Sequence, residues 1–315
     1  MYFGRQRAQL PSAGEISVSN LQVSIVLPLP KLVASRCDSC CEDNNQRDDM
    51  TLPSPVRQKA ARGALENLFV FPAAVYAVHY ACQSFYRGEQ LASPRVTAIG
   101  LRQFDGGQIT SFSILQEAEP FHISAEEVAQ YLDFFERRLL ESFFQFVKGS
   151  RHARFVHWNM RNAQYGFAAL EHRLRVLGGQ PDIIPESQRF DLASLMYDLY
   201  GSRYVDGTTK LENLARLNEL SMGGFLRGAD EAEAFEAGRY RDVLASTLCK
   251  VRIISEIAIK ANDRTLNTKA TWWCVNGGPY RLTIQKVRDN PLYSLLAGGA
   301  GAIAAALKFF EYFAR

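Results

Sequence analysis

The stretch RVTAIGLRQFDGGQITSFSI, Arg95 to Ile114, decides the fold of this chain. Two runs rich in β-branched and apolar residues, 95–101 and 109–114, flank the triplet Asp105-Gly106-Gly107. An Asp-Gly pair between two such runs favours a tight hairpin turn, whose central residues take positive φ. The stretch therefore predicts two antiparallel strands joined by a short turn.

The segments on either side of this hairpin predict an α/β fold. An aromatic and aliphatic run at 69–86 predicts a strand before the hairpin. After the hairpin, Ser124 and Glu127 form a capping-box pattern, and apolar residues then recur every three or four positions to Phe143, which predicts one amphipathic helix. The later segments predict a strand at 154–158 and helices at 166–177, 192–200, 210–218, 230–235 and 240–257. Three strands, a helix, a fourth strand and further helices are typical of an α/β domain.

The composition is that of an ordinary folded protein. The chain has 315 residues, of which 47% are hydrophobic and 22% charged, and its net charge of +3 neither requires nor excludes a nucleic-acid partner. Cys37 and Cys40 have only half of a zinc-knuckle spacing, so we expect free thiols in a reducing cytoplasm.

The organisation along the chain follows from changes in composition. Residues 1–59 are mostly polar and predict a poorly structured segment, in which Met50 is an alternative start. We expect the α/β domain at 60–262 and a hairpin or connector at 263–290. Residues 291–313 predict a hydrophobic helix, because 291–307 carry no charge. This helix is either a membrane anchor, or buried against the domain or in a homo-oligomer.

The segment HWNMRNAQYGF, His157 to Phe167, is the strongest candidate for a ligand site. It lies between a predicted strand and a predicted helix, and it combines aromatic, basic and amide side chains: Trp158, Tyr165, Arg161, Asn159 and Asn162. Such sets stack on bases and bind phosphates. The alternative is that Trp158 and Phe167 belong to the core and that Arg161 is solvated.

The order of elements from Phe69 to Ile257 resembles that of the DEDD-type 3′–5′ exonuclease domain, which has a ribonuclease H-like fold. In that family the first strand ends in Asp-x-Glu, whereas here the corresponding VHYACQS, 78–84, has no carboxylate. The second motif is similar at His157 and Asn159, but Gln164 or Tyr165 stands near the place of its aspartate. The segments RFDLASLMYDLYG and KLENLARLNEL resemble two of the family's helices. On the last helix, Lys250 stands near the place of another aspartate.

The resemblance implies a binding module that has lost its catalytic activity. Cleavage by two metal ions needs clustered oxygen ligands, which these positions lack, so no metal cofactor is expected. We expect instead a catalytically degenerate module that binds nucleic acid or a nucleotide, with Lys250 offering a fixed positive charge to phosphate. The expected ligand-binding residues are His157, Trp158, Asn159, Arg161, Asn162, Tyr165 and Lys250.

Three other hypotheses stay open. The first is an active nuclease that uses Mg²⁺ or Mn²⁺ and relocated acids, drawn from His157, Glu171, Asp191, Asp198 and Asp242. The second is a membrane-associated scaffold that contacts other proteins only. The third is an acid–base site that depends on the fold bringing together His79, His157, His172 and Asp191. On the helix at 230–235, Glu231 and Glu233, like the following Glu236, are expected to face solvent.

Overall fold

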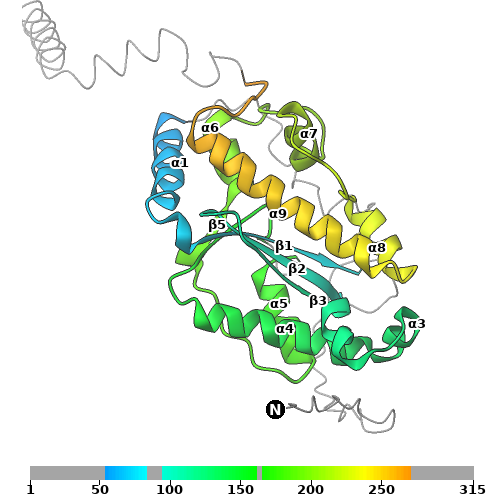
Figure 1. Cartoon of the computed structure of the whole chain (residues 1–315). Helices are drawn as coiled ribbons and strands as arrows, with labels where there is room; N and C mark the ends of the chain where they lie inside the picture. The colour runs from blue at the N-terminus through cyan, green and yellow to red at the C-terminus, as the bar shows by residue number, and fades with distance from the viewer. Residues whose placement is uncertain (1–53, 84–93, 162–164, 271–315) are drawn as a thin grey trace, which may run out of the picture.

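The computed structural model describes residues 54–83, 94–161 and 165–270. A mixed five-stranded sheet lies at its centre, with helices packed on both faces (Figure 1). The α/β fold predicted from the sequence is therefore confirmed.

The sheet has the strand order β3-β2-β1-β4-β5. The first three strands form an antiparallel meander, and β4 and β5 run parallel to β1. Their bounds are β1 Val75–Cys82, β2 Val96–Gln103, β3 Ile109–Ser113, β4 Arg154–His157 and β5 Arg189–Asp191. Gly106 and Gly107 both have positive φ, 68° and 67°, as the hairpin turn between β2 and β3 requires. The carboxyl ends of β1, β4 and β5 lie at the same end of the sheet because these strands are parallel.

The helices form two layers, one on each face of the sheet (Figure 1). Their bounds are α1 Pro55–Leu68, α2 Ile114–Ala118, α3 Ala125–Val128, α4 Leu132–Gly149, α5 Phe167–Val176, α6 Leu192–Tyr200, α7 Lys210–Leu217, α8 Gly228–Glu236 and α9 Tyr240–Asn262. The long helix α9 crosses one face together with α1 and α6, and α4 and α5 cover the other.

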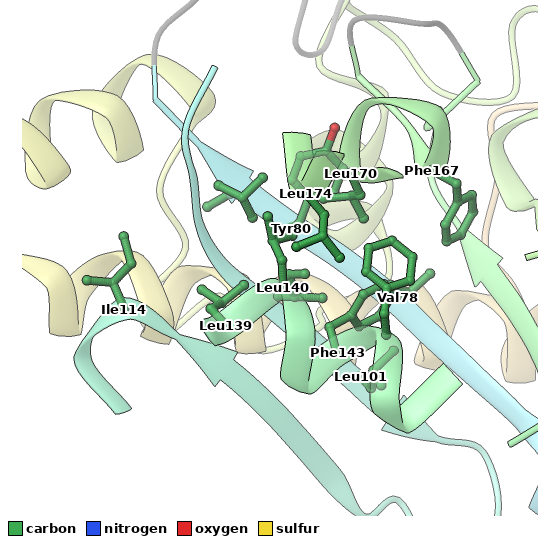
Figure 2. Close-up of a cluster of buried hydrophobic side chains, with 14 of the residues drawn as sticks. Val78, Tyr80, Leu101, Ile114, Leu139, Leu140, Phe143, Phe167, Leu170 and Leu174 are labelled. Carbon is green, nitrogen blue, oxygen red and sulfur yellow. The ribbon is translucent and has the colours of Figure 1, made fainter. Parts of the chain in front are cut away.

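Alternation along the strands divides the core into two hydrophobic clusters. Val78 and Tyr80 of β1 point toward α4 and α5, where they lie in one cluster with Leu140 and Phe143 (Figure 2). Ala77 points the opposite way, into the cluster that α1, α6 and α9 complete. Because successive side chains of a strand alternate between faces, this division also fixes the face on which each polar strand residue lies.

The structure differs from the predicted elements in several places. Strand β5, Arg189–Asp191, is absent from the prediction, which has only the helix that follows it. The capping box at Ser124 and Glu127 is present, but the helix it starts ends at Val128, and a 3₁₀ turn separates it from α4. Val128 before the break and Phe135 after it belong to the same hydrophobic cluster. Ile114 begins helix α2 instead of ending a strand, because Ser113 caps that helix. Helix α1 begins at Pro55, inside the segment whose composition predicts little structure, with proline at its favoured first position.

The predicted hydrophobic helix at 291–313 and most of the connector at 263–290 lie outside the described residues. Within the three described ranges, no helix is long and apolar enough to cross a bilayer.

Substitution of Gly100 by alanine is expected to destabilise the protein by about 1–3 kcal/mol. A Cβ at this β2 position would lie 3.3 Å from Leu248 Cδ2, Thr247 Cγ2 and Val251 Cγ1 of α9, which packs closely on the strand here. The matched control is Gly63→Ala in α1, where a Cβ has no neighbour within 4 Å. That variant should gain up to about 1 kcal/mol from helix propensity. Urea unfolding measures the free energy of unfolding of both variants. Equal values would contradict the close approach of α9 to Gly100.

Candidate functional site

Polar side chains gather in two places near the carboxyl ends of the parallel strands. The first group, here called the arginine site, consists of Asn159, Arg161, Asp191 and Ser194. The second, here called the β1–α9 cluster, consists of His79, Tyr165, Glu231 and Lys250.

Asp191 organises the arginine site. It ends β5 beside His157 of β4, and its Oδ1 accepts the N–H of Ala193 at 3.1 Å, which caps helix α6. The same oxygen accepts the N–H of Asn159 at 3.0 Å, and Oδ2 accepts the Ser194 hydroxyl at 2.9 Å. Asn159 has a φ of 57°, in the left-handed region that asparagine tolerates better than most residues. These bonds fix the turn after β4 against the start of α6.

Arg161 is presented to solvent by this framework. Its Nε lies 2.7 Å from Asp191 Oδ2, its Nη1 donates to Ser194 Oγ at 2.9 Å, and its Nη2 donates to Asn159 Oδ1 at 2.7 Å. The side chain is still 53% exposed. Each terminal nitrogen carries two N–H groups, so each retains one donor beyond these bonds. A half-exposed guanidinium that is held in a fixed orientation and keeps free donors suits a phosphate or carboxylate oxygen.

His157 is a buried residue next to the arginine site, and its neutral ring accepts a hydrogen bond. Its Nδ1 accepts the N–H of Met160 at 3.2 Å. Burial lowers the pKa of His157 to about 4; Asp191 acts against this decrease, while the positive charges of Arg161 and Arg189 add to it. The ring is therefore uncharged at neutral pH.

The stability of the protein is expected to fall as the pH drops from about 6.5 toward 4. Unfolded His157 takes up a proton near its ordinary pKa of 6.5, but folded His157 does so only at about 4, so protons favour the unfolded chain between these values. The loss from this residue is up to about 3 kcal/mol. Urea unfolding across this pH window should show a weaker dependence in His157→Asn, whose amide oxygen can still accept from Met160. His172→Asn, at an exposed position of α5, should keep the dependence of the original chain.

His79 does not join His157, because the two side chains lie on opposite faces of the sheet. His79 shares the face of Ala77, and His157 shares the face of Phe155 and contacts Phe167. His79 Nδ1 lies 3.3 Å from the Tyr165 hydroxyl, which donates to the Tyr80 carbonyl at 3.0 Å. Burial, with a further contribution from the charge of Lys250, lowers the pKa of His79 well below its ordinary value. The proposed acid–base set is therefore not assembled, and His172 is exposed on α5.

Lys250 forms a buried ion pair with Glu231. Their Nζ and Oε2 atoms are 2.7 Å apart, and each side chain is only 6% exposed. Lys250 Nζ also lies 5.3 Å from the centre of the Phe225 ring. The expectation that Glu231 faces solvent is wrong, although Glu233 and Glu236 are exposed. A buried ammonium requires a nearby carboxylate, and Glu231 meets that need from α8.

The remaining predicted residues are dispersed. Trp158 is half-buried against the cluster around α9, Tyr165 is buried with its ring stacked on Tyr80 at 4.5 Å, and Asn162 lies outside the described residues. Glu171 pairs with Arg189 at 3.1 Å, and Asp242 pairs with Arg239 at 3.6 Å. Asp198 is partly exposed on α6. In the described part of the chain, no three His, Cys, Asp or Glu side chains group as metal ligands would.

The prediction from sequence omitted Ser194, which bonds both Asp191 and Arg161. Its position three residues after the helix-capping Asp191 was the available signal, since side chains at these two positions of a helix start can meet.

Comparison with known proteins gave no match, either among protein-family models or among curated proteins.

Proposed function

We propose that this chain is a ribonuclease H-like, exonuclease-like domain that has lost metal-dependent cleavage and binds nucleic acid or a nucleotide at the arginine site. The sheet supports the fold part of this proposal, because an antiparallel meander is followed by two strands parallel to the first. The order of strands and helices from Phe69 to Ile257 is also the one that the resemblance implies.

The loss of cleavage is supported by the β1–α9 cluster. Strand β1 and helix α9 are the elements on which the exonuclease family carries metal-binding acids, and here they bring together His79 and Lys250. A cation and a neutral imidazole cannot hold two Mg²⁺ ions, which prefer oxygen ligands. Among the acids of the active-nuclease hypothesis, Glu171, Asp191 and Asp242 are each paired with an arginine.

The observation that carries the binding proposal is the orientation of Arg161. Three neighbours hold its guanidinium, which remains half exposed with donors to spare. Lys250 contributes less than expected, because Glu231 already balances its charge. Trp158, three residues before Arg161 in the sequence, is partly exposed, and we propose that it offers a ring for base stacking.

Arg161→Gln is expected to weaken binding of a fluorescein-labelled single-stranded oligonucleotide about tenfold or more, because a charge-assisted contact to phosphate is lost. The affinity of Arg161→Lys should lie between those of the original chain and Arg161→Gln, since lysine keeps the charge and lacks the fork of donors. The matched control is Arg137→Gln, which removes a half-exposed arginine paired with Glu141 on α4. Fluorescence anisotropy at low salt, with ATP as a competitor, measures the affinities.

Two results would contradict the proposal. One is an equal loss of affinity in Arg137→Gln and Arg161→Gln, which would indicate a nonspecific charge effect. The other is shortening of the oligonucleotide in Mg²⁺ or Mn²⁺ that Asp191→Ala abolishes, which would support the active nuclease instead.

A further inference from the structure

The end of the sheet opposite the arginine site exposes apolar side chains. Val70 and Phe71 follow helix α1 and are 60% and 66% exposed, and Ile109 at the start of β3 is 45% exposed. The Gln103 amide donates to the Ala73 carbonyl at 2.6 Å, which ties the β2–β3 hairpin to the turn that carries Val70 and Phe71. Apolar residues that protrude side by side from a folded surface mark sites of interaction.

Basic side chains lie next to this apolar turn. The last turn of α4 carries exposed Lys148, the connection to β4 carries exposed Arg151 and His152, and Arg154 begins β4. Arg154 is opposite Val75 in the sheet, and its Nη1 donates to the Asn67 carbonyl at 2.8 Å, so this connection is held beside the end of α1. In Figure 1 the last turns of α1 and α4 lie at the same left-hand end of the sheet.

Two cations of this region have no carboxylate partner within the described residues. Neither Lys148 nor Arg151 forms an ion pair there, whereas the exposed arginines 137, 216 and 239 each do. Nearby loops carry the acidic residues Asp105 and Glu186, and Glu186 lies 3.6 Å from Arg189. Cations that form no ion pair, next to protruding apolar side chains, are complementary to a surface that is both anionic and apolar.

We infer that this region, here called the basic–apolar surface (Val70, Phe71, Lys148, Arg151, His152 and Arg154), binds peripherally to anionic lipid membranes. Val70 and Phe71 would enter the boundary between headgroups and acyl chains, while the cations contact anionic headgroups. A nucleic acid fits less well, because aliphatic Val70 offers no hydrogen bond or ring to a base. The membrane contact would leave the arginine site at the far end of β4 facing away from the lipid.

Co-sedimentation of the full chain with vesicles tests this inference. Vesicles of phosphatidylcholine with about 30% phosphatidylserine should bind the protein, and pure phosphatidylcholine should bind it far less. Lys148→Gln with Arg151→Gln should reduce partitioning roughly 25-fold, at about fivefold for each cation. Val70→Ser with Phe71→Ser should reduce it roughly tenfold through lost apolar insertion. Raising the salt concentration should weaken binding, because exposed charges are screened.

The chain offers matched controls for both changes. Val176→Ser removes a half-exposed apolar residue from the end of α5, and Arg137→Gln with Arg216→Gln removes two exposed cations from other surfaces. Neither control should change partitioning. Phe71→Trp provides a second measurement, since its emission should shift to the blue with anionic vesicles and not with neutral ones.

Several outcomes would overturn the inference. Vesicle binding that survives both double substitutions would assign the contact to another part of the chain, such as residues 291–313. Equal binding to neutral and anionic vesicles would remove the role of the cations. Loss of oligonucleotide affinity in Lys148→Gln with Arg151→Gln, without any vesicle binding by the original chain, would assign the surface to nucleic acid.

Discussion

Replacing Lys250 with methionine is expected to lower the free energy of unfolding by about 3–5 kcal/mol. Methionine fills much of the same space, so the main loss is the positive charge opposite Glu231. The Glu231 carboxylate already lacks one hydrogen bond, because within the described structure its Oε1 is buried without a hydrogen-bond partner. Without Lys250, both oxygens would be buried and unpaired, or the group would take up a proton.

A double-mutant cycle separates the ion pair from the shape of the site. Glu231→Leu alone should also destabilise, since it strands the Lys250 ammonium. Lys250→Met with Glu231→Leu should recover most of either loss, because replacing a whole buried pair with apolar residues is often close to neutral. Lys260→Met on the same helix is the control and should change stability by less than about 0.5 kcal/mol. Additive losses in the double variant would contradict a mutual pairing.

The same cycle bears on function. If Lys250 contacted phosphate, the double variant would lose oligonucleotide affinity even with its stability restored. The 2.7 Å contact with Glu231 leads us to expect that affinity is retained. Lys250, which the sequence predicts as a phosphate contact, would then have the structural role of holding α8 against α9.

The parts of the fold that the sequence predicts well depend on neighbours along the chain. The hairpin at Asp105 to Gly107, the capping box at Ser124 and the cap at Asp191 each involve residues within a few positions of one another. The turn after β4 is likewise proposed as a site from its own residues, and Arg161 in this turn is half exposed. Local sequence patterns predict these features well because each hydrogen bond they imply joins residues within a single turn of the chain.

The parts that were missed depend on contacts across the fold. The pairing of Lys250 with Glu231 joins two helices, and periodicity on α8 alone gave no reason to bury a glutamate. The separation of His79 from His157 depends on the register of β1 against β4, in which Ala77 pairs with Val156. A shift of one residue would have put both rings on the same face. Neither pairing nor register can be read from a single strand or helix.

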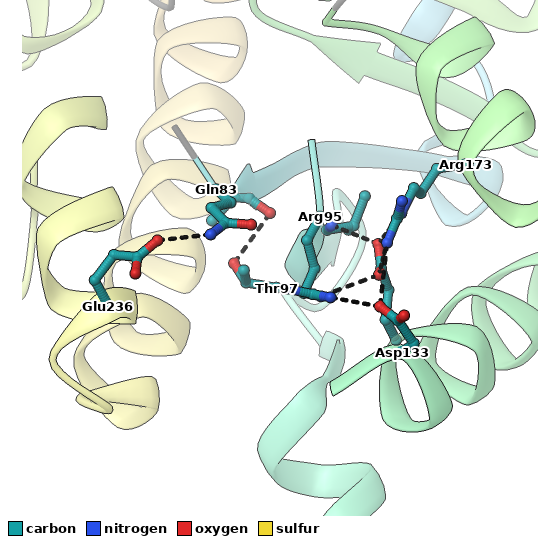
Figure 3. A network of polar contacts seen from close by, with 9 residues as sticks. Gln83, Arg95, Thr97, Asp133, Arg173 and Glu236 are labelled. Atoms are coloured by element: carbon teal, nitrogen blue, oxygen red, sulfur yellow. Dashed lines mark hydrogen bonds and ion pairs between the residues drawn. The ribbon is translucent and has the colours of Figure 1, made fainter. Parts of the chain in front are cut away.

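Glu136→Leu is expected to cost about 3–5 kcal/mol, for the same physical reason in a different place. Glu136 is fully buried on α4, and its carboxylate accepts from Arg173 Nε at 2.8 Å and Nη2 at 2.6 Å. It also accepts the N–H of Val96 at 2.7 Å, and Arg95 Nε lies 3.4 Å away. One side chain thus joins α4 to α5 and to the start of β2, in the network around Arg95 and Arg173 in Figure 3.

Asp133 provides a control within the same network. It contacts both arginines, at 3.5 Å for Arg173, but its side chain is 54% exposed. Asp133→Asn should therefore cost less than about 1 kcal/mol, as exposed ion pairs do. Glu136→Gln should lie between this value and that of Glu136→Leu, because the amide keeps an acceptor for Val96 and loses the charge.

Urea unfolding of these variants should be measured at about pH 8, because burial raises the pKa of Glu136 and the comparison requires an ionised carboxylate. If Asp133→Asn proved as costly as Glu136→Gln, the number of arginine contacts would determine the energy and burial would not. We expect instead that Glu136→Gln costs more stability than Asp133→Asn. The two carboxylates share Arg95 and Arg173, but Glu136 is buried and also accepts the Val96 N–H. A large difference between them would therefore measure the combined effect of burial and of this additional hydrogen bond.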